Sequence, residues 1–225
     1  MTLLQHASSR LPRELRWFLT IYVAVLIPIY LVTYGPTNFL YFCDMALLLT
    51  LVAMWHRSAL LVSAAAVGIL LPQLLWALDF MSSLFGLPIT GMTEYMFQDS
   101  IPLHVRVLSF FHFWLPFLLL WLLRRTGYHP RGLPVWMVLS FASLYVCYFF
   151  IPPPPAPVSN PNLPVNINYV YGFSDAAPQS WMPEAVWFVL LQVMLVFLVF
   201  LPSHWALKRL YPPAPDAKSD NQPAA

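Results

Sequence analysis

The chain has 225 residues, of which 60% are apolar and only 9% are charged, and its formal net charge is +2. A soluble domain has about a quarter of its residues charged, so this composition excludes an ordinary soluble protein and indicates a protein of the lipid bilayer. The small net charge argues against a nucleic-acid partner. The two cysteines, Cys43 and Cys147, are too few for a disulfide-rich scaffold or a four-cysteine metal site.

Six apolar stretches are long enough to be transmembrane helices, which need about 20 residues each. They are continuous rather than alternating, so they predict helices and not strands. The predicted spans are residues 17–34, 38–55, 58–80, 101–123, 133–151 and 183–203. Arginines precede the first span as in a signal peptide, but the span is long and no small-residue cleavage motif follows it. We therefore expect an uncleaved helix and an all-α bundle of six transmembrane helices, in a single domain of residues 1–211.

The positive charges predict how this bundle is oriented. Ten of the eleven Lys and Arg residues lie before the first span or after the second, fourth and sixth spans. The eleventh, Arg106, lies inside the fourth span. Since positive loops stay in the cytoplasm, we expect both termini there and the two long loops, residues 81–100 and 152–182, on the outer side. Residues 212–225 are rich in Pro and Ala and predict a disordered cytoplasmic tail.

The fourth span carries an unusual set of polar side chains. On a continuous helix His104, Arg106, Ser109 and His112 share one broad arc, which we expect to face the bundle interior because lipid would not solvate it. Pro116 has no N–H to donate to the carbonyl of His112, so we predict a kink at this point.

Ionisable side chains inside a membrane are candidates for function. Asp44 lies about 9 Å below the outer boundary at the helical rise of 1.5 Å per residue, next to Cys43. In a catalytic interpretation Cys43 is the nucleophile, His112 its base and Asp44 or Asp79 the orienting carboxylate. The candidate substrate-binding residues are Arg106, which suits a lipid phosphate, and His104, Asp79, Glu94, Asn168 and Tyr169.

The same residues also have structural interpretations. Asp44 and Arg106 could form a buried ion pair that fixes helix register, and His112 could be a core imidazole. Cys43 could be a small apolar filler, and its estimated depth would also allow a disulfide with Cys147.

No motif in the sequence identifies a cofactor, which leaves the cofactor unknown. Asp44, Asp79, His104 and His112 could supply three zinc ligands, but no zinc-site spacing connects them, and we predict no metal site.

Several segments resemble a bacterial group of multi-pass membrane-associated proteins without an established activity. They are residues 39–50, 75–80, 93–97, 108–112 and 166–172. This resemblance implies a protein of the bacterial inner membrane. More distantly, the chain is similar to integral-membrane ether-phospholipid acyltransferases, whose intramembrane Cys carries an acyl thioester. That resemblance implies roles for Cys43, Asp44 and His112.

Two functions are therefore expected. The first is a lipid-acting acyltransferase or hydrolase with a polar cavity in the outer half of the bilayer. The second is a non-enzymatic membrane protein, either an accessory subunit or a protein that binds a lipid or small molecule. The expected partners are membrane lipids and, in the second case, other membrane subunits.

Overall fold

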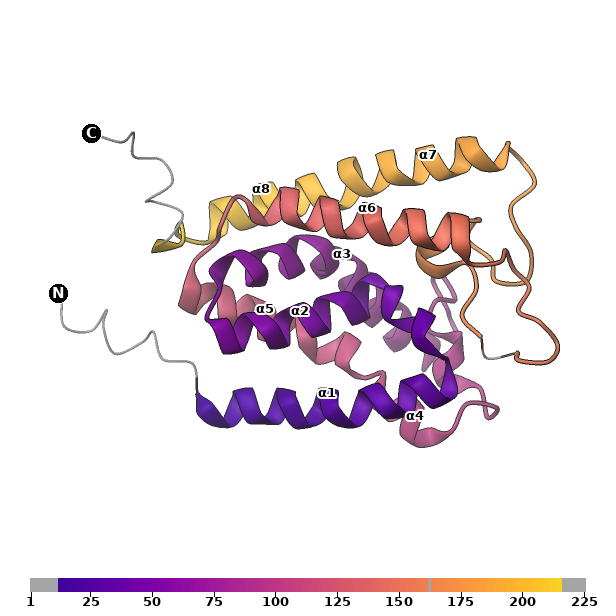
Figure 1. The fold of residues 1–225 in the computed structure, drawn as a ribbon, viewed down its shortest axis with the longest axis horizontal. Helices are drawn as coiled ribbons and strands as arrows, with labels where there is room; N and C mark the ends of the chain where they lie inside the picture. Colours follow the sequence, from indigo (N-terminus) through magenta and orange to yellow (C-terminus); the bar gives the residue numbers. More distant parts are fainter. Residues whose placement is uncertain (1–11, 162, 216–225) are drawn as a thin grey trace.

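The computed structural model describes residues 12–161 and 163–215, and this part of the chain is helical without a β-strand (Figure 1). Four short or irregular helical segments are η1 (Pro36–Leu40), η2 (Glu94–Phe97), η3 (Ile167–Tyr169) and the π-helical η4 (Leu195–Phe200). The α-helices are α1 (Arg13–Thr33), α2 (Phe42–His56), α3 (Ala59–Ser83), α4 (Leu103–Leu108), α5 (Phe111–Thr126), α6 (Gly132–Phe150), α7 (Glu184–Met194) and α8 (Leu201–Leu210).

Five helical segments are long and apolar enough to cross a membrane. They are α1, α3, α4 with α5, α6, and α7 through α8. Their positions match five of the six predicted spans, and their length and composition are those of a helical membrane protein. The remaining predicted span, residues 38–55, corresponds to part of η1 and to the shorter apolar helix α2 of 15 residues.

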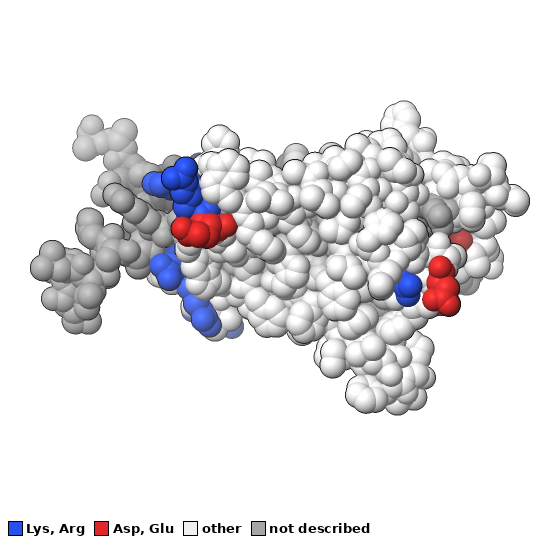
Figure 2. All heavy atoms as spheres, turned by 90° about the horizontal axis from the view of Figure 1, so that it is seen from below, with Lys and Arg blue, Asp and Glu red and all other residues white. Residues whose placement is uncertain are grey.

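The helices alternate in direction, so the start of α1 and the end of α8 lie at the same end of the bundle (Figure 1). Contacts join the elements at this end: the Arg16 guanidinium lies 5.3 Å from the Trp55 ring centre, and the Tyr128 hydroxyl lies 2.6 Å from His204 Nδ1. Charged side chains lie at the two ends, and the surface between them is free of charge on the face shown in Figure 2. We call the end that holds the start of α1 and the end of α8 the basic end. Eight of the nine described Lys and Arg residues belong to its elements: Arg13, Arg16, Arg57, Arg124, Arg125, Arg131, Lys208 and Arg209.

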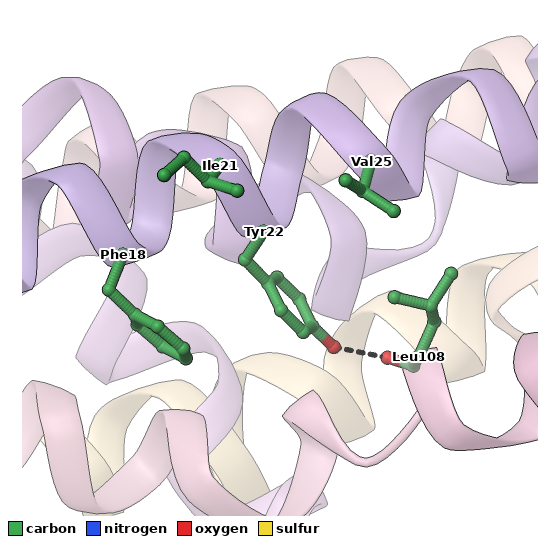
Figure 3. Close-up of a pocket in the computed structure, with 5 residues that line it drawn as sticks. All are labelled: Phe18, Ile21, Tyr22, Val25 and Leu108. Carbon is green, nitrogen blue, oxygen red and sulfur yellow. Dashed lines mark hydrogen bonds between the residues drawn. The ribbon is translucent and has the colours of Figure 1, made fainter.

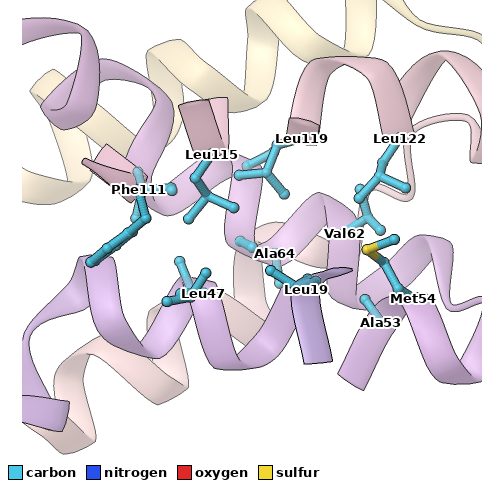
Figure 4. Packing of buried hydrophobic residues seen from close by; sticks show 14 of the residues in the cluster. Leu19, Leu47, Ala53, Met54, Val62, Ala64, Phe111, Leu115, Leu119 and Leu122 are labelled. Carbon is cyan, nitrogen blue, oxygen red and sulfur yellow. The ribbon is translucent and has the colours of Figure 1, made fainter. Parts of the chain in front are cut away.

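Helix α3 forms the centre of the bundle. In its most apolar window 61% of the residues are buried, against 22–33% in the other four long segments. Small residues between 62 and 69 let neighbouring helices approach closely. A Cβ on Gly68 would lie 1.8 Å from the ring of Trp136, and one on Gly132 would lie 2.7 Å from Ser63 Cβ. Large side chains of α1, α2 and α5 complete this core, among them Leu19, Leu47, Leu115 and Leu119 (Figure 4).

The fourth predicted span is interrupted, but the interruption lies at Ser109–Phe110 and not at Pro116 as predicted. The His112 N–H bonds the Ser109 carbonyl at 3.2 Å, three residues back, which leaves the Leu108 carbonyl outside the regular α-helical pattern. The Ser109 hydroxyl also bonds a carbonyl in the preceding turn, which competes with helix formation. The helix therefore breaks nearly two turns before the proline.

This break also overturns the predicted polar arc. Residues on the two sides of the interruption no longer follow one helical repeat, so their side chains point in different directions. His104 is exposed, Arg106 is half-buried with 19% of its side chain accessible, and Ser109 is buried.

The last helix runs through a π-helical stretch, because Pro202 lacks the N–H that would bond the Leu198 carbonyl. In compensation, the Leu201 N–H bonds the Val196 carbonyl, five residues back. The helix continues to Leu210, seven residues beyond the predicted end of this span.

The chain after α8 folds back on the α5–α6 turn. The Tyr128 N–H donates to the Pro212 carbonyl at 2.8 Å, and the Ala214 N–H donates to the Tyr128 carbonyl at 3.0 Å. Gly127, with φ of 77°, allows this approach, since a Cβ there would lie 2.9 Å from Pro212 and Ala214. The first residues of the predicted disordered tail are thus paired, and residues 216–225 lie outside the described residues.

Candidate functional site

Asp79, a predicted substrate-binding residue, organises the loop that follows α3. Its buried carboxylate accepts five hydrogen bonds: from the N–H groups of Ile89, Thr90, Gly91 and Thr93, and from the Thr93 hydroxyl, at 2.6–3.1 Å. Hydrogen bonds to a charged acceptor are the stronger kind. These bonds occupy both oxygens of the carboxylate, which leaves little capacity for a ligand.

Asn168 has a similar structural position in the second long loop. Its Oδ1 accepts the N–H of Phe42 at 3.0 Å, and its Nδ2 donates to the Leu40 carbonyl at 2.9 Å and to the Ser143 hydroxyl at 3.4 Å. The side chain thus satisfies a free N–H at the start of α2. These bonds hold the second long loop on the bundle.

Tyr169, the next residue, lies at the surface of the same loop. Its carbonyl accepts the Trp187 indole N–H at 2.9 Å, and its side chain is 36% exposed. Partial burial and the negative charge of Asp175 raise the pKa of the Tyr169 phenol to about 12. The phenol is therefore neutral at physiological pH.

Arg106 forms its ion pair with Asp99 and not with Asp44. The Nη2–Oδ1 distance is 3.9 Å, the Asp99 side chain is fully exposed, and Nη1 donates to the Met96 carbonyl at 3.2 Å. The predicted Asp44–Arg106 pair does not form, because the break in the helix leaves Arg106 beside the η2 loop. Glu94 is also exposed, so neither it nor Arg106 joins the buried polar residues.

Asp44 lies inside the bundle with 3% of its surface exposed. Its Oδ2 accepts the Asn38 amide at 3.3 Å and lies 3.8 Å from the Cys43 sulfur. Its Oδ1 is buried and has no hydrogen-bond partner among the described residues. An unpaired buried carboxylate oxygen is costly and needs an explanation.

Further polar side chains lie buried or partly buried inside the bundle, and we call the set that includes Asp44 the polar interior. The hydroxyls of Tyr30 and Ser109 lie 2.8 Å apart, and both residues are buried. The hydroxyl of Tyr95 in η2 lies near the side chains of Trp76 and Ser109. The members of the polar interior are Tyr30, Asn38, Cys43, Asp44, Gln73, Trp76, Tyr95 and Ser109.

Two more members of the polar interior resemble Asp44 in lacking partners. Gln73 is 2% exposed and Trp76 is 5% exposed, one helical turn apart on α3. Within the described part of the chain, the amide nitrogen and oxygen of Gln73 have no hydrogen-bond partner, and the same is true of the Trp76 indole N–H. The polar interior therefore contains three side chains with unused hydrogen-bonding capacity.

His112 is near this group but its contacts differ from those predicted. Its Nδ1 lies 2.7 Å from the Ser109 carbonyl, which can only accept, so Nδ1 carries a hydrogen. The ring stacks on Trp76 and contacts Phe111, with centroid distances of 5.0 and 4.1 Å. Among the described residues, no hydrogen bond joins Cys43 to His112.

The thiol of Cys43 faces the carboxylate of Asp44 instead of a base. A neighbouring carboxylate disfavours the thiolate that a nucleophile needs. Cys43 and Cys147 are both free thiols, so the disulfide that the sequence allowed does not form.

An apolar groove opens on the surface between α1 and the α4–α5 break, with a volume of about 280 Å³ (Figure 3). Phe18, Ile21, Val25 and Leu108 line it together with Tyr22. The Tyr22 hydroxyl donates to the Leu108 carbonyl, the group that the helix break frees. Leu108 directly precedes Ser109, whose hydroxyl lies 2.8 Å from that of Tyr30, so the groove adjoins the polar interior at the helix break.

Four residues of this region were not predicted from the sequence: Tyr22, Tyr30, Gln73 and Trp76. A signal was present, because Tyr22 and Tyr30 are eight residues apart and thus about 80° apart on a helix at 100° per residue. Polar-tipped residues on one side of an apolar span indicate an inward face.

Among the described residues, no group of three or more His, Cys, Asp and Glu side chains could hold a metal ion. Comparison with family models, curated proteins and solved structures finds no match to this chain.

Proposed function

We propose that the chain is a six-span membrane protein with both ends in the cytoplasm, and that it binds an acylated lipid. The span that the five long segments leave out comprises η1 and α2, residues 36–56, and α2 packs against α3 as an antiparallel hairpin. The orientation is supported by the basic end, since positive loops remain in the cytoplasm.

The observation that carries the lipid proposal is the apolar groove that adjoins the buried polar interior. Three groove residues on α1 are 46–60% exposed on a surface that we assign to the membrane: Phe18, Ile21 and Val25. An acyl chain is the apolar molecule that a membrane supplies to such a surface. The groove wall stays apolar at Tyr22, because the hydroxyl of this residue is turned onto the Leu108 carbonyl.

The arrangement supports binding better than acyl transfer or hydrolysis. A cysteine nucleophile needs a base within hydrogen-bond reach, yet Cys43 faces Asp44, and His112 donates from Nδ1 to a backbone carbonyl. The Asp79 carboxylate is occupied by hydrogen bonds from the loop that follows α3. Catalysis by these residues would require them to change partners.

The test compares lipid retention in two variants of α1. Ile21→Trp fills the groove, whereas Val32→Trp adds the same side chain at a position that is 89% exposed and outside the groove. Native mass spectrometry of purified protein, followed by analysis of the extracted lipid, measures occupancy. We expect bound lipid in the wild type and in Val32→Trp and a several-fold loss in Ile21→Trp. Equal retention in the two variants would exclude the groove as the lipid site.

A further inference from the structure

We propose that a second pocket, at the basic end of the bundle, binds the phosphate group of an anionic phospholipid. We call it the boundary pocket; it has a volume of about 320 Å³ and is lined by Arg124, Leu210, Tyr211 and Pro212. It shares no residue with the apolar groove. The inference therefore goes beyond the proposed function, since it assigns a different site to a different part of a lipid.

The boundary pocket forms where the chain after α8 returns to the end of α5. The Tyr128 N–H donates to the Pro212 carbonyl at 2.8 Å, and the Ala214 N–H donates to the Tyr128 carbonyl at 3.0 Å. These two bonds hold Pro212 against the turn that follows Arg124. The pocket is therefore formed before a ligand arrives, and a preformed site loses less conformational entropy on binding.

Two candidate membrane spans end at this pocket. The first is the segment Leu103–Thr126, and Arg124 lies in its last turn. The second is the segment Glu184–Leu210, whose last side chain is apolar and 74% exposed. The end of a transmembrane segment lies where the hydrocarbon core gives way to the headgroups. The boundary pocket is thus at the depth of the lipid phosphates, whichever side of the membrane the basic end faces.

The Arg124 guanidinium is the group that we assign to the phosphate. Its side chain is exposed, and within the described residues it has no hydrogen bond or ion pair. The adjacent Arg125 differs, because its guanidinium lies 4.9 Å from the ring centre of Trp121. A guanidinium presents parallel N–H donors that match two phosphate oxygens, so it recognises phosphate more specifically than a point charge does.

The charges around the boundary pocket favour an anion. Lys208 and Arg209 lie in the last turn of α8, directly before Leu210. Among the described residues of the basic end, Glu14 is the only carboxylate, against eight Lys and Arg residues. Basic pockets between transmembrane helices bind anionic headgroups. A lipid with a quaternary ammonium group would place a positive charge beside these cations, so we assign the pocket to a lipid whose phosphate carries the net charge.

Titration of the purified full-length protein with two lipids of identical acyl chains tests this assignment. Phosphatidylglycerol is anionic, whereas phosphatidylcholine has the same phosphate and a quaternary ammonium group. Native mass spectrometry measures the affinity for each lipid. We expect the wild type to prefer phosphatidylglycerol, and Arg124→Gln to bind it about fivefold more weakly, which is the effect of one basic residue at a lipid surface. A wild-type protein without this preference would overturn the proposal whether or not the variants fold.

Arg13→Gln is the matched control, because Arg13 is an exposed arginine of the same end that does not line the pocket. We expect it to bind phosphatidylglycerol within about twofold of the wild type, since salt screens exposed charges that do not contact the ligand. Equal losses in Arg13→Gln and Arg124→Gln would overturn the pocket in favour of a general attraction to the basic end. Unchanged binding by Arg124→Gln would also overturn it, and would leave Arg124 as a cation that serves only the negative C-terminal end of α5.

Inorganic phosphate distinguishes a lipid from a soluble ligand, because it offers the same oxygens without an acyl chain. We expect an excess of inorganic phosphate to leave most of the phosphatidylglycerol bound, since burial of the acyl chains adds to the lipid's affinity. If inorganic phosphate binds the wild type but not Arg124→Gln, and displaces the lipid, then the pocket takes a soluble phosphate and the lipid assignment is wrong.

The variant Ile21→Trp separates this inference from the proposed function. We expect Ile21→Trp to lose the groove lipid and to keep the preference for phosphatidylglycerol that Arg124 provides. Loss of that preference in Ile21→Trp would place the anionic lipid in the groove and overturn the boundary pocket. If only Arg124→Gln lost lipid, the boundary pocket would stand and the groove would be excluded as a lipid site.

Discussion

Substituting Asp79 by asparagine tests whether this carboxylate organises the loop after α3. The carboxylate accepts three hydrogen bonds at Oδ1 and two at Oδ2. An asparagine keeps one oxygen, so at least two of the five bonds are lost, and a buried Thr93 N–H then faces an amide donor. Each bond to a charged group contributes about 1.5–3 kcal/mol. We therefore expect Asp79→Asn to lower the free energy of unfolding by about 3–5 kcal/mol.

Two assays follow this change. Thermal unfolding of the purified protein measures its stability, and hydrogen exchange reports the amides of residues 89–93 directly. We expect a lower melting temperature and faster exchange at these amides. The matched control is Asp99→Asn, which removes the same charge from an exposed position and should cost at most about 1 kcal/mol.

The reasoning fails if Asp79→Asn unfolds like the wild type and its loop amides remain protected. The result would mean that the loop is held by other contacts. If such a variant also lost bound lipid, the ligand-binding role that the sequence predicted for Asp79 would be restored.

Three further predictions concern packing, loop attachment and orientation. Gly68→Ala should destabilise the protein by about 1–3 kcal/mol through its clash with Trp136, more than the gain of about 1 kcal/mol in helix propensity; in a Trp136→Ala background, the same change should be neutral or stabilising, as a double-mutant cycle of unfolding would show. Asn168→Ala should cost about 2–3 kcal/mol by removing its bonds to the start of α2, and limited proteolysis should then cut the second long loop faster, whereas unchanged cleavage would contradict its anchoring role. Reporter fusions after Tyr211 should read cytoplasmic and those within residues 152–165 external; the opposite pattern would reverse the orientation.

The helical class and the approximate positions of the long helices could be predicted because they depend on local properties. Hydropathy over about 20 residues and the presence of Lys and Arg in adjacent loops are both read along the chain. For example, α6 starts at Gly132, one residue before the start predicted from hydropathy. The basic end follows from the same pattern, since every second connection lacks a positive charge.

The roles of the polar residues depended on neighbours distant in the sequence. Asn168 was predicted to bind substrate, but its partner is the Phe42 N–H, 126 residues away. The sequence allowed a buried ion pair between Arg106 and Asp44. Depth along a helix does not fix rotation about its axis, and the break at Ser109–Phe110 changes that rotation.

The sequence by itself thus determined that this is an apolar helical protein with its positive charges at alternate connections. Tertiary structure alone decided that Asp79 and Asn168 bond their loops, that the Cys43 thiol faces Asp44, and that Asp44 retains an unpaired oxygen inside the bundle. The physical reason is that burial depends on the sum of a segment's side chains, whereas a hydrogen bond depends on the position of one atom to within a few tenths of an ångström. Only the packing of α1, α2, α3 and the α4–α5 break fixes such positions.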